Sequence, residues 1–550
     1  MPISFRFLPV AVGLAVMAAC AQATPTTGPP APPPQLNLEQ RPAGQCETGK
    51  EPWRAQGAPK RGGTFVAVGF LTDLDATRPP TKKINFTYES LVRLRACLEQ
   101  DDVVVPGLAK SWDVTPDGLT WTFKLRDDVR WQNVPPVNGR PLSSADVAWS
   151  IDHQKTGGDV KPLWDPVEHQ EPDAQTVVLR LKTPQPDFLS QLAYISNVVV
   201  PREIFEQNKD FKNLAVGTGP FIIRSFQPNQ SLVAERNPSY YLKVADGQSL
   251  PYLDRFELTN TPDRSAALAA FRTGQADGLP GGLTFTKPEA DALRQSNAKV
   301  TMQTVMLNST WGLYFNATKK PFDSPLVRRA FSLAMDREDQ ILGPEKGGAV
   351  YAGFMPGAIM NYVWPQQKLK EKFAPNPNEA KKLLTEAGLS APLEVEIKTV
   401  QIYAEGAEVA AKQLEAIGVK SKIVVEQSNS RAQMAQGDFS LLWGAYPQSN
   451  LPGYWMSDIV KSGSNINYMR FSDARVDALA AAQGRETDVG KRKQIINDLQ
   501  DRLYETMPYA PAVSKVIFQF YSCKVQNMKP YHFALALDGV EAAWLDPSKC

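Results

Sequence analysis

The chain has 550 residues, of which 43% are hydrophobic and 21% are charged, an ordinary composition for a globular protein. This length exceeds what one hydrophobic core usually supports, so we expect at least two lobes. Its 60 basic and 58 acidic residues are spread along the chain and give a net charge of +2. A nucleic-acid-binding protein would concentrate basic residues on one face, so no nucleic-acid partner is expected.

The N-terminus has the pattern of a secretory signal. Arg6 precedes an apolar run from Phe7 to Ala19, which is too short to span a bilayer. The alternative is a hydrophobic N-terminal strand. No later apolar run is long enough to cross a membrane, so residues 1–19 are interpreted as a signal peptide and the body of the protein as exported and soluble.

Two processing sites compete after this segment. Met17-Ala18-Ala19-Cys20 resembles a bacterial lipobox, in which Cys20 becomes the lipidated N-terminus, whereas Ala21-Gln22-Ala23 is an ordinary small-x-small cleavage site. Residues 20–59 are rich in Pro, Gly and Thr, a composition typical of an extended tether. Because an anchored protein needs a spacer, we expect a lipid anchor at Cys20 and association with a membrane through it.

The remaining cysteines are Cys46, Cys97, Cys523 and Cys550. An even number in an oxidising compartment predicts two disulfides, for which three connectivities are possible. We favour the more local pairing, Cys46–Cys97 and Cys523–Cys550. No CxxC motif or Cys/His cluster is present, so no zinc site is expected.

Hydrophobic periodicity predicts strands in the first half of the chain and alternating helices and strands in the second. Strands are expected at 60–70, 119–126, 176–181, 215–226, 393–400 and 421–426. Helices are expected from Pro325 after an N-cap at Ser324, from Pro377 after an N-cap at Asn376, at 405–419, and at 489–505 after an N-cap at Thr487. The alternation predicts an α/β lobe with a partly parallel sheet.

The sequence carries no recognisable catalytic or metal-binding pattern. His153, His169 and His532 are its only histidines, none stands in a nucleophile–base context, and no G-x-S-x-G motif occurs. The Gly-rich stretch 217–220 lacks the Lys and the following Ser/Thr of a phosphate loop, and is interpreted as a tight turn entering a strand. We therefore expect no enzyme, no cofactor and no metal; a secreted hydrolase is the disfavoured alternative.

Several motifs in order resemble the large extracellular solute-binding proteins of bacterial ABC importers, the group that includes oligopeptide-, dipeptide- and nickel-binding proteins. The resemblance covers nearly everything after about residue 60. The motifs that carry it lie at 104–131 (VVPGLAKSWDVTPDGLTWTFKLRDDVRW), 143–151 (SSADVAWSI), 216–241 (VGTGPFIIRSFQPNQSLVAERNPSYY), 321–338 (PFDSPLVRRAFSLAMDRE) and 468–511, the closing helices.

The resemblance implies an α/β, two-lobed periplasmic-binding-protein fold of the Venus flytrap type, with an extra subdomain inserted in lobe I. Lobe I is then expected at 60–95, 215–305 and 510–550, the inserted subdomain at 96–214, and lobe II at 306–509. Chain crossings between the lobes are expected at 308–316 and 507–513.

The implied function is capture of a peptide or other small solute between the lobes and its delivery to a membrane permease. Partners are then the ligand and the ABC permease subunits, and the protein is expected to be a monomer that is periplasmic or at the cell surface. The alternative is an exported solute receptor or holdase chaperone of the same fold without a transport role.

Two departures from the relatives' pattern matter for the ligand. At 131–140 the relatives carry His-Asp-Gly, of which only Gly139 is present, and this is interpreted as a loop change. Peptide-binding relatives also carry a Trp followed shortly by an Asp that accepts the peptide's ammonium. Trp443 matches the Trp, but residues 444–448 supply no acid; Asp438 or Asp458 is a possible substitute. The open ligand classes are free-amine peptides, N-blocked peptides, glycosides, small polar conjugates, metal chelates and apolar solutes.

Aromatic residues beside turns are the best candidates for contact with ligand, since binding groups tend to lie on loops held by a rigid scaffold. An arginine near them could pair with an anionic group. The candidate ligand-binding residues are Trp443, Tyr446, Trp311, Tyr314, Tyr88 and Arg78.

Overall fold

The computed structural model describes most of the chain after the N-terminal segment. The described residues are 58–69, 71–77, 86–94, 104–157, 161–193, 197–244, 247–279, 285–296, 299–359, 361–389, 392–427, 430–446, 449, 451–528 and 539–550. The expected signal peptide, the tether except for its last two residues, Cys20, Cys46, Cys97 and Arg78 lie outside them. None of the helices in the described part of the chain is both long and apolar enough to cross a bilayer.

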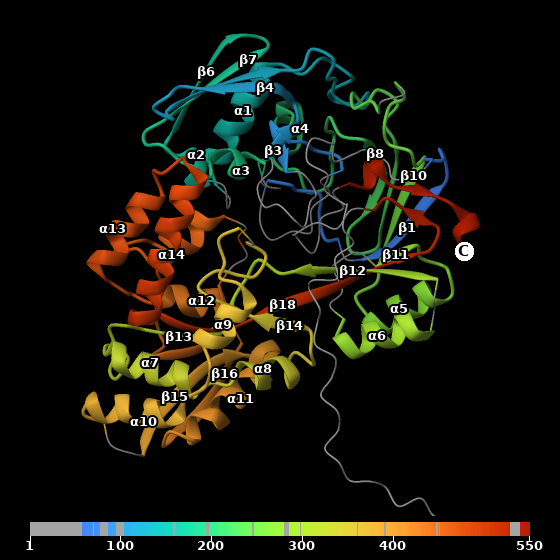
Figure 1. Cartoon of the computed structure of the whole chain (residues 1–550). Helices are drawn as coiled ribbons and strands as arrows, with labels where there is room; N and C mark the ends of the chain where they lie inside the picture. The colour runs from blue at the N-terminus through green and yellow to red at the C-terminus, as the bar shows by residue number, and fades with distance from the viewer. Residues whose placement is uncertain are drawn as a thin grey trace, which may run out of the picture. The chain divides into compact units, whose positions relative to one another are not determined.

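One mixed sheet of 12 strands runs through the described residues, in the order β16-β15-β17-β13-β18-β11-β1-β10-β9-β8, with β12 and β14 also paired to β18. Its strands are β1 Thr64–Gly69, β8 Phe221–Gln227, β9 Ser231–Arg236, β10 Arg255–Asn260, β11 Gly278–Leu279, β12 Val300–Met306, β13 Trp311–Phe315, β14 Ala349–Tyr351, β15 Leu393–Val400, β16 Val419–Glu426, β17 Leu441–Ala445 and β18 Tyr509–Ser522. Figure 1 shows β18 as one long strand that connects the region of β13 and β14 with the region of β11 and β12.

The partners of β18 change along its length. Its first half, up to Lys515, pairs with β13 and β14, and its second half, from Val516, pairs antiparallel with β12 and β11. β12 ends at Met306 and β13 begins at Trp311, so the chain passes outward between two regions of the sheet at 307–310. The return passage lies in β18 beside it.

The region around β13 contains the predicted alternation of helices and strands. β15 pairs parallel with both β16 and β17, which confirms the partly parallel sheet predicted from the sequence. Helices here are α7 Pro325–Ala334, α8 Arg337–Leu342, α9 Gln366–Lys372, α10 Pro377–Glu386, α11 Ala404–Glu415, α12 Ser430–Gln436, α13 Ala474–Gln483 and α14 Val489–Thr506, with short helical turns at Gln401–Tyr403 and Tyr454–Asp458.

The predicted helix starts are found, with two departures in the capping chemistry. Ser324 is the N-cap of α7, with Pro325 in the first turn, but its side chain makes no capping hydrogen bond. The Asn376 side chain accepts a hydrogen bond from the Glu379 N–H, and Pro377 occupies the first turn. The N-cap of α14 is Asp488, whose carboxylate accepts from the Lys491 N–H. The expectation of Thr487 was wrong by one residue, because either side chain can cap a helix and only the backbone turn decides between them.

A second, separate sheet lies in the segment that the sequence assigned to an inserted subdomain. Its order is β4-β5-β7-β6, all antiparallel, with bounds β4 Ala109–Val114, β5 Thr120–Leu125, β6 Val167–Asp173 and β7 Thr176–Leu181. Helices α1 Ser144–Lys155, α2 Lys161–Trp164, α3 Phe188–Leu192 and α4 Arg202–Asn208 accompany it (Figure 1). The short pairs β2 Val92–Leu94 with β3 Val104–Pro106, and β19 Val525–Gln526 with β20 Trp544–Leu545, complete the described strands.

The buried hydrophobic residues of the described chain form separate clusters. The first core joins the inserted sheet to β1, β8, β9 and β10, and the second core surrounds β13, β15, β17 and the first half of β18. A smaller cluster packs α5 Arg264–Arg272 and α6 Lys287–Ser296 against the second half of β18. Separate cores joined by crossing strands make this a two-lobed fold.

Cys523 and Cys550 are disulfide-bonded, with their Cα atoms 5.3 Å apart. This is the pairing that the sequence favoured for these two cysteines. It ties the C-terminal residue to the end of β18, where β19 and β20 follow. The other expected pair lies outside the described residues.

Candidate ligand-binding site

Three chain segments converge at one edge of the sheet in the second core. β15 and β17 run parallel and end at Val400 and Ala445, and β13 runs antiparallel to β17, with Trp311 opposite Ala445. The carboxyl ends of β15 and β17 therefore share an edge with the start of β13. Ligands of open α/β sheets bind beyond the carboxyl ends of the strands. This edge of the sheet is therefore the candidate ligand-binding site.

The crossing segment 307–310 is fixed at this edge by its backbone and one hydroxyl. The Leu307 N–H donates to the Lys515 carbonyl over 2.8 Å. The Ser449 N–H donates to the Asn308 carbonyl over 2.9 Å, and the Ser309 hydroxyl donates to the Tyr446 carbonyl over 2.6 Å. The crossing, the return strand and the loop after β17 are thus one hydrogen-bonded unit.

Asn308 and Thr310 carry polar atoms that this unit does not use. Both residues have no exposed surface. The Asn308 Nδ2 and Oδ1 atoms and the Thr310 hydroxyl have no hydrogen-bond partner among the described residues. Asn308 is the one side chain of the described chain with two such atoms. A buried polar group without a partner costs about 1–3 kcal/mol. Unpartnered buried groups are therefore expected where a bound molecule supplies the missing hydrogen bonds.

The aromatic ring of Trp311 lies beside these residues, with the Lys515 ammonium over it. Its ring is 5% exposed and meets the Tyr403 ring edge to face at 6.3 Å. The Lys515 ammonium lies 4.9 Å from the Trp311 ring centroid and 2.6 Å from a Glu345 carboxylate oxygen. Burial raises the pKa of the Glu345 carboxyl, and the Lys515 charge opposes that rise. Lys515 is therefore already paired within the protein.

Tyr314 and Tyr446 join the same aromatic group but have internally satisfied hydroxyls. Tyr314, with no exposed surface, donates to the Thr310 carbonyl over 2.6 Å and stacks on Tyr509 at 5.1 Å. The Tyr446 hydroxyl accepts from the Tyr468 N–H over 3.1 Å, donates to the Ile466 carbonyl over 3.2 Å, and its ring stacks on Tyr468 at 5.5 Å. These contacts attach Tyr446, which follows β17, to the segment 466–468, and attach Tyr314 to the crossing at Thr310.

Trp443 lies on β17 with its ring against α11. It is 3% exposed, and a Cβ added at Gly406 would lie 2.5 Å from Trp443 Nε1. Only glycine permits so close an approach of the helix to the indole. The Trp443 carbonyl also accepts from the Thr399 hydroxyl over 3.0 Å. The ring therefore packs between sheet and helix in the second core.

Tyr88 belongs to the other lobe. It is 1% exposed and packs in the first core, where burial first and the Asp75 charge second raise its pKa well above the ordinary range. The structure thus brings Trp311, Tyr314, Tyr446 and Trp443 into one lobe and places Tyr88 in the other. It does not describe Arg78.

Asp438 and Asp458, the acids considered as substitutes for the missing carboxylate, have other surroundings. Gly444 and Ala445 belong to β17. Asp438 is 80% exposed at its side chain and pairs with Lys398 at 3.2 Å. Asp458 ends the helical turn Tyr454–Asp458, and its pKa is raised to about 7 because surrounding protein desolvates it and the Asp187 charge repels it. A carboxyl with such a pKa is partly neutral near pH 7, which weakens it as an ammonium partner.

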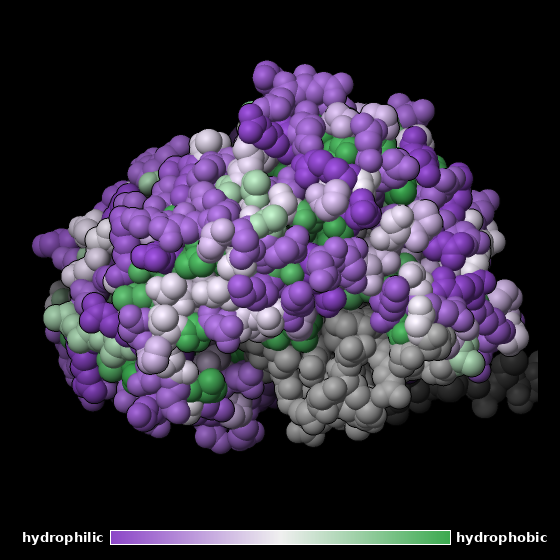
Figure 2. Space-filling model, turned by 90° about the horizontal axis from the view of Figure 1, so that it is seen from above, coloured by the Kyte–Doolittle hydropathy of each residue, from purple (hydrophilic) through white to green (hydrophobic). Residues whose placement is uncertain are grey.

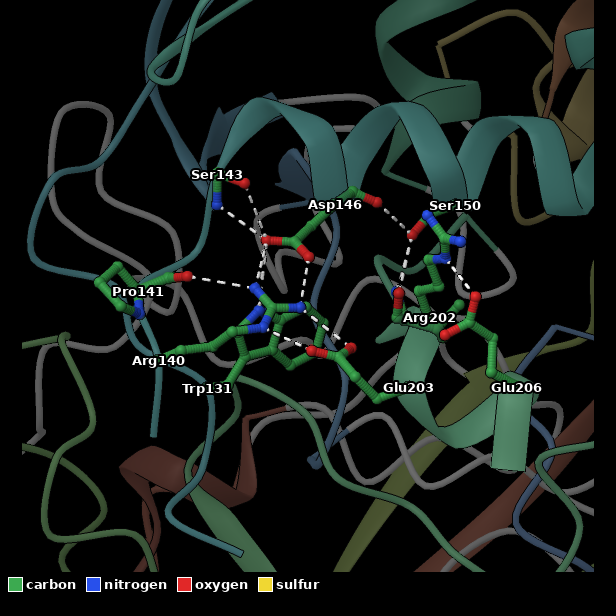
Figure 3. Close-up of polar contacts among 10 residues, drawn as sticks. Trp131, Arg140, Pro141, Ser143, Asp146, Ser150, Arg202, Glu203 and Glu206 are labelled. Atoms are coloured by element: carbon green, nitrogen blue, oxygen red, sulfur yellow. Dashed lines mark hydrogen bonds and ion pairs between the residues drawn. The ribbon is translucent and has the colours of Figure 1, made fainter. Parts of the chain in front are cut away.

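The altered loop at 131–140 is anchored by charge pairs of its own (Figure 3). Arg140 lies 2.6 Å from Asp146 Oδ1 and 2.6 Å from Glu203 Oε1, and its guanidinium lies 5.5 Å from the Trp131 ring centroid. The Arg140 side chain lowers the pKa of the Glu203 carboxyl. The cluster fixes the loop to α1 and α4, which agrees with its interpretation as a structural loop change.

Sequence reasoning missed Asn308, Thr310 and Lys515. A signal was present, since Asn308-Ser309-Thr310 is a run of three polar residues directly before the strand WGLYF, which is buried throughout. Among the described residues, no group of three or more His, Cys, Asp and Glu side chains could hold a metal ion.

Separate cores joined by crossing strands give a two-lobed architecture, the fold class of periplasmic binding proteins. Residues 103–468 match the family of bacterial extracellular solute-binding proteins, family 5. The chain belongs to this family. The match supports the role expected from the sequence, the substrate-binding component of an ABC importer, over the receptor or holdase alternative.

Similar proteins agree in class and differ in ligand. The chain is 24% identical over 446 residues to a glutathione-binding protein of Salmonella typhimurium, covering 77% of this chain and 83% of that protein. It is 24% identical over 475 residues to di/tripeptide-binding protein 1 of Pseudomonas aeruginosa, covering 78% and 84%. The solved structure of a periplasmic binding protein from Helicobacter pylori with the peptide STSA has a TM-score of 0.71 at 22% identity, covering 88% and 98%. This last likeness establishes the fold.

Proposed function

We propose that the protein encloses a small peptide or another amide-containing solute between its lobes and recognises it with Asn308 and Thr310. The observation that carries this proposal is the buried Asn308 side chain, whose donor and acceptor both lack partners among the described residues. A carboxamide offers two donors on nitrogen and acceptor lone pairs on oxygen. A secondary amide, with one N–H and one C=O, complements it directly.

The chemistry around Asn308 favours a neutral polar ligand group at this point. Lys515 is paired with Glu345, and the sequence from 444 to 448 contains no acid. A buried ammonium without a carboxylate would cost several kcal/mol. The ligand's recognition is therefore proposed to rest on amide hydrogen bonds and aromatic contact, and to tolerate a blocked amino end. Relatives named for glutathione and for di- and tripeptides support the peptide-like class.

The six predicted residues take different roles in this proposal. Trp311 offers its ring to the ligand, while Tyr314, Tyr446 and Trp443 hold the loops and strands around the crossing. Tyr88 and Arg78 are kept as the proposed contribution of lobe I.

We also propose the lobe boundaries expected from the sequence: 60–95, 215–305 and 510–550 for lobe I, 96–214 for its inserted subdomain, and 306–509 for lobe II. The change of partners in β18 between Lys515 and Val516 supports a boundary a few residues after 510. The separate four-stranded sheet supports the inserted subdomain.

Export, lipid anchoring at Cys20 and a monomeric state complete the proposal. The face seen in Figure 2 is largely hydrophilic, with its hydrophobic residues scattered. Among the described residues the large hydrophobic side chains that are exposed are Val114, Ile402, Val425 and Val489. These four side chains are a small apolar area compared with what a stable dimer interface buries, which supports a monomer.

The ligand proposal is tested by thermal denaturation with matched peptides. Trialanine and N-acetyl-trialanine should both raise the melting temperature of solute-stripped protein, because ligand binds only the native state. Each peptide is added at about 1 mM. N-acetylation should not weaken the effect. Stabilisation by the free-amine peptide alone would contradict the proposed tolerance, and stabilisation by neither would contradict the peptide-like class.

The anchor is tested separately by fractionation of cells that express the wild-type chain or the Cys20→Ser variant. The wild type should incorporate labelled palmitate and sediment with membranes, whereas the variant should lose the label. Unlabelled wild-type protein whose N-terminus begins at Thr24 would show cleavage after Ala21-Gln22-Ala23 instead.

A further inference from the structure

A buried ion pair joins the two lobes away from the crossing strands. Asp187 precedes α3, whose Phe188 and Leu192 pack in the first core, and Arg492 lies on α14, whose Ile496 and Leu499 pack in the second. Arg492 Nη1 lies 2.5 Å from Asp187 Oδ1, and Nη2 lies 2.8 Å from Oδ2. The side chains are only 6% and 8% exposed. In Figure 1, α13 and α14 rise toward α2 and α3.

Lobe II holds Arg492 ready for this contact. Gln483 Oε1 accepts from Arg492 Nε over 3.2 Å and from Nη2 over 3.0 Å, and the guanidinium lies 5.6 Å from the Tyr362 ring centroid. These partners all come from the second lobe. They keep Arg492 in position whether or not Asp187 is present.

Lobe II also receives the carboxylate of Asp187 with a backbone donor. The Gly453 N–H donates to Asp187 Oδ2 over 2.9 Å. A Cβ added at Gly453 would lie 2.6 Å from that oxygen, so glycine is needed here for close approach. The Asp187 carboxylate thus accepts three hydrogen bonds, from two lobe II residues, and separation of the lobes would break all of them.

We propose that Asp187 and Arg492 form a closure latch, which sets the population of the closed form without touching the ligand. Among the ion pairs between described residues, this is the one that links the first core to the second. A desolvated ion pair is favourable when its geometry is bidentate and when hydrogen-bond donors satisfy both oxygens of the carboxylate. Removing one partner leaves the other charge buried in the closed form but solvated in the open form, so the loss falls on closure alone.

The consequence for binding follows from the population of the competent state. Apparent affinity falls in proportion to the fraction of protein that can reach the closed form. Loss of the latch should therefore weaken every ligand by a common factor of about tenfold or more, in keeping with the cost of an unpaired buried charge. This prediction for ligands rests on the proposed enclosure of solute between the lobes; the prediction for the ligand-free protein does not.

Two variants break the latch by different means. Asp187→Asn removes the charge and keeps the size of the side chain. Gly453→Ala keeps every polar group and blocks the approach of the carboxylate; its backbone angles, φ −58° and ψ −38°, suit alanine. The matched control is Asp501→Asn, which breaks an ion pair with Lys372 inside the second lobe, where N and O are 3.2 Å apart.

The deciding experiment is small-angle X-ray scattering of the full-length, solute-stripped protein. Asp187→Asn and Gly453→Ala should both raise the radius of gyration, Asp501→Asn should leave it unchanged, and the swapped pair Asp187→Arg with Arg492→Asp should restore part of the compaction. A radius of gyration that is the same in wild type, Asp187→Asn and Gly453→Ala would overturn the latch. Titration with trialanine then tests the common loss of affinity, and its failure with altered scattering would count against the proposed ligand class and not the latch.

Discussion

The Ser309 hydroxyl donates to the Tyr446 carbonyl over 2.6 Å and so binds the outward crossing to the loop that follows β17. The Ser449 N–H returns a bond to the Asn308 carbonyl. With these groups hydrogen-bonded to each other, Asn308 and Thr310 retain side-chain polar atoms that have no partner among the described residues. The segment proposed to recognise solute is therefore also the segment that joins the two regions of the sheet.

Asn308→Ala should reduce the stabilisation by trialanine without lowering the melting temperature of the solute-stripped protein. The side chain makes no hydrogen bond to any described residue that the change could remove, whereas a bound amide would lose one or two, worth about 0.5–1.5 kcal/mol each. Affinity should fall by about threefold to a hundredfold, as calorimetry can measure. Asn208→Ala, an exposed change on α4, is the control. Unchanged affinity in Asn308→Ala would remove this residue from the site.

Tyr446→Phe should lower the free energy of unfolding by about 1–3 kcal/mol, because it leaves the Tyr468 N–H and the Ile466 carbonyl without their partner in a buried setting. Urea denaturation measures the change. Tyr521→Phe is the matched control, since its buried hydroxyl has only a long contact of 3.4 Å with Gln519. Equal losses in the two variants would mean that the Tyr446 hydroxyl does not organise the loops.

Asp458 should make stability depend on pH. Its pKa is raised from 3.8 to about 7, chiefly by desolvation and then by Asp187, with Lys461 opposing. The native state then binds a proton more tightly than the unfolded chain, so the contribution is greatest below pH 3.8 and is lost as pH rises toward 7. Asp458→Asn should raise the melting temperature at pH 8 relative to wild type and remove this part of the decline between pH 5 and 8. Parallel pH profiles for the two proteins would contradict the shift.

The Cys523–Cys550 disulfide should stabilise the C-terminal segment. It closes a loop with a sequence separation of 27, for which the loss of entropy in the unfolded chain amounts to about 3–4 kcal/mol. The double variant Cys523→Ser with Cys550→Ser should lower the melting temperature by several degrees. Scanning calorimetry checks this without reducing the cysteines outside the described residues. A melting temperature equal to that of the wild type would mean that the bond does not form.

The sequence predicted the elements that local chemistry controls. Asn376 and Pro377 correctly predicted the start of α10, and the predicted strand LEVEIKTV is found at Leu393–Val400. Capping, proline position and alternation act within a few residues, so they can be read without tertiary information.

The candidate site was harder to predict from the sequence, because the burial of a side chain depends on the tertiary structure. Nothing local distinguishes Trp443, packed against Gly406, from an aromatic open to a ligand. Likewise Asp187 and Arg492 are 305 residues apart in the chain, and only the approach of two cores makes them a pair. Asn308 was expected only as the first residue of a chain crossing at 308–316, because the lack of partners for its side chain is visible only in the structure.

The most direct test of the central claim is native mass spectrometry of the protein purified under non-denaturing conditions from its own host. We predict that the wild type and Asn208→Ala carry an amide-containing small molecule bound one to one, and that the double variant Asn308→Ala with Thr310→Val has lost it. Retention of the same solute at the same occupancy by that double variant would contradict recognition at the crossing between the lobes.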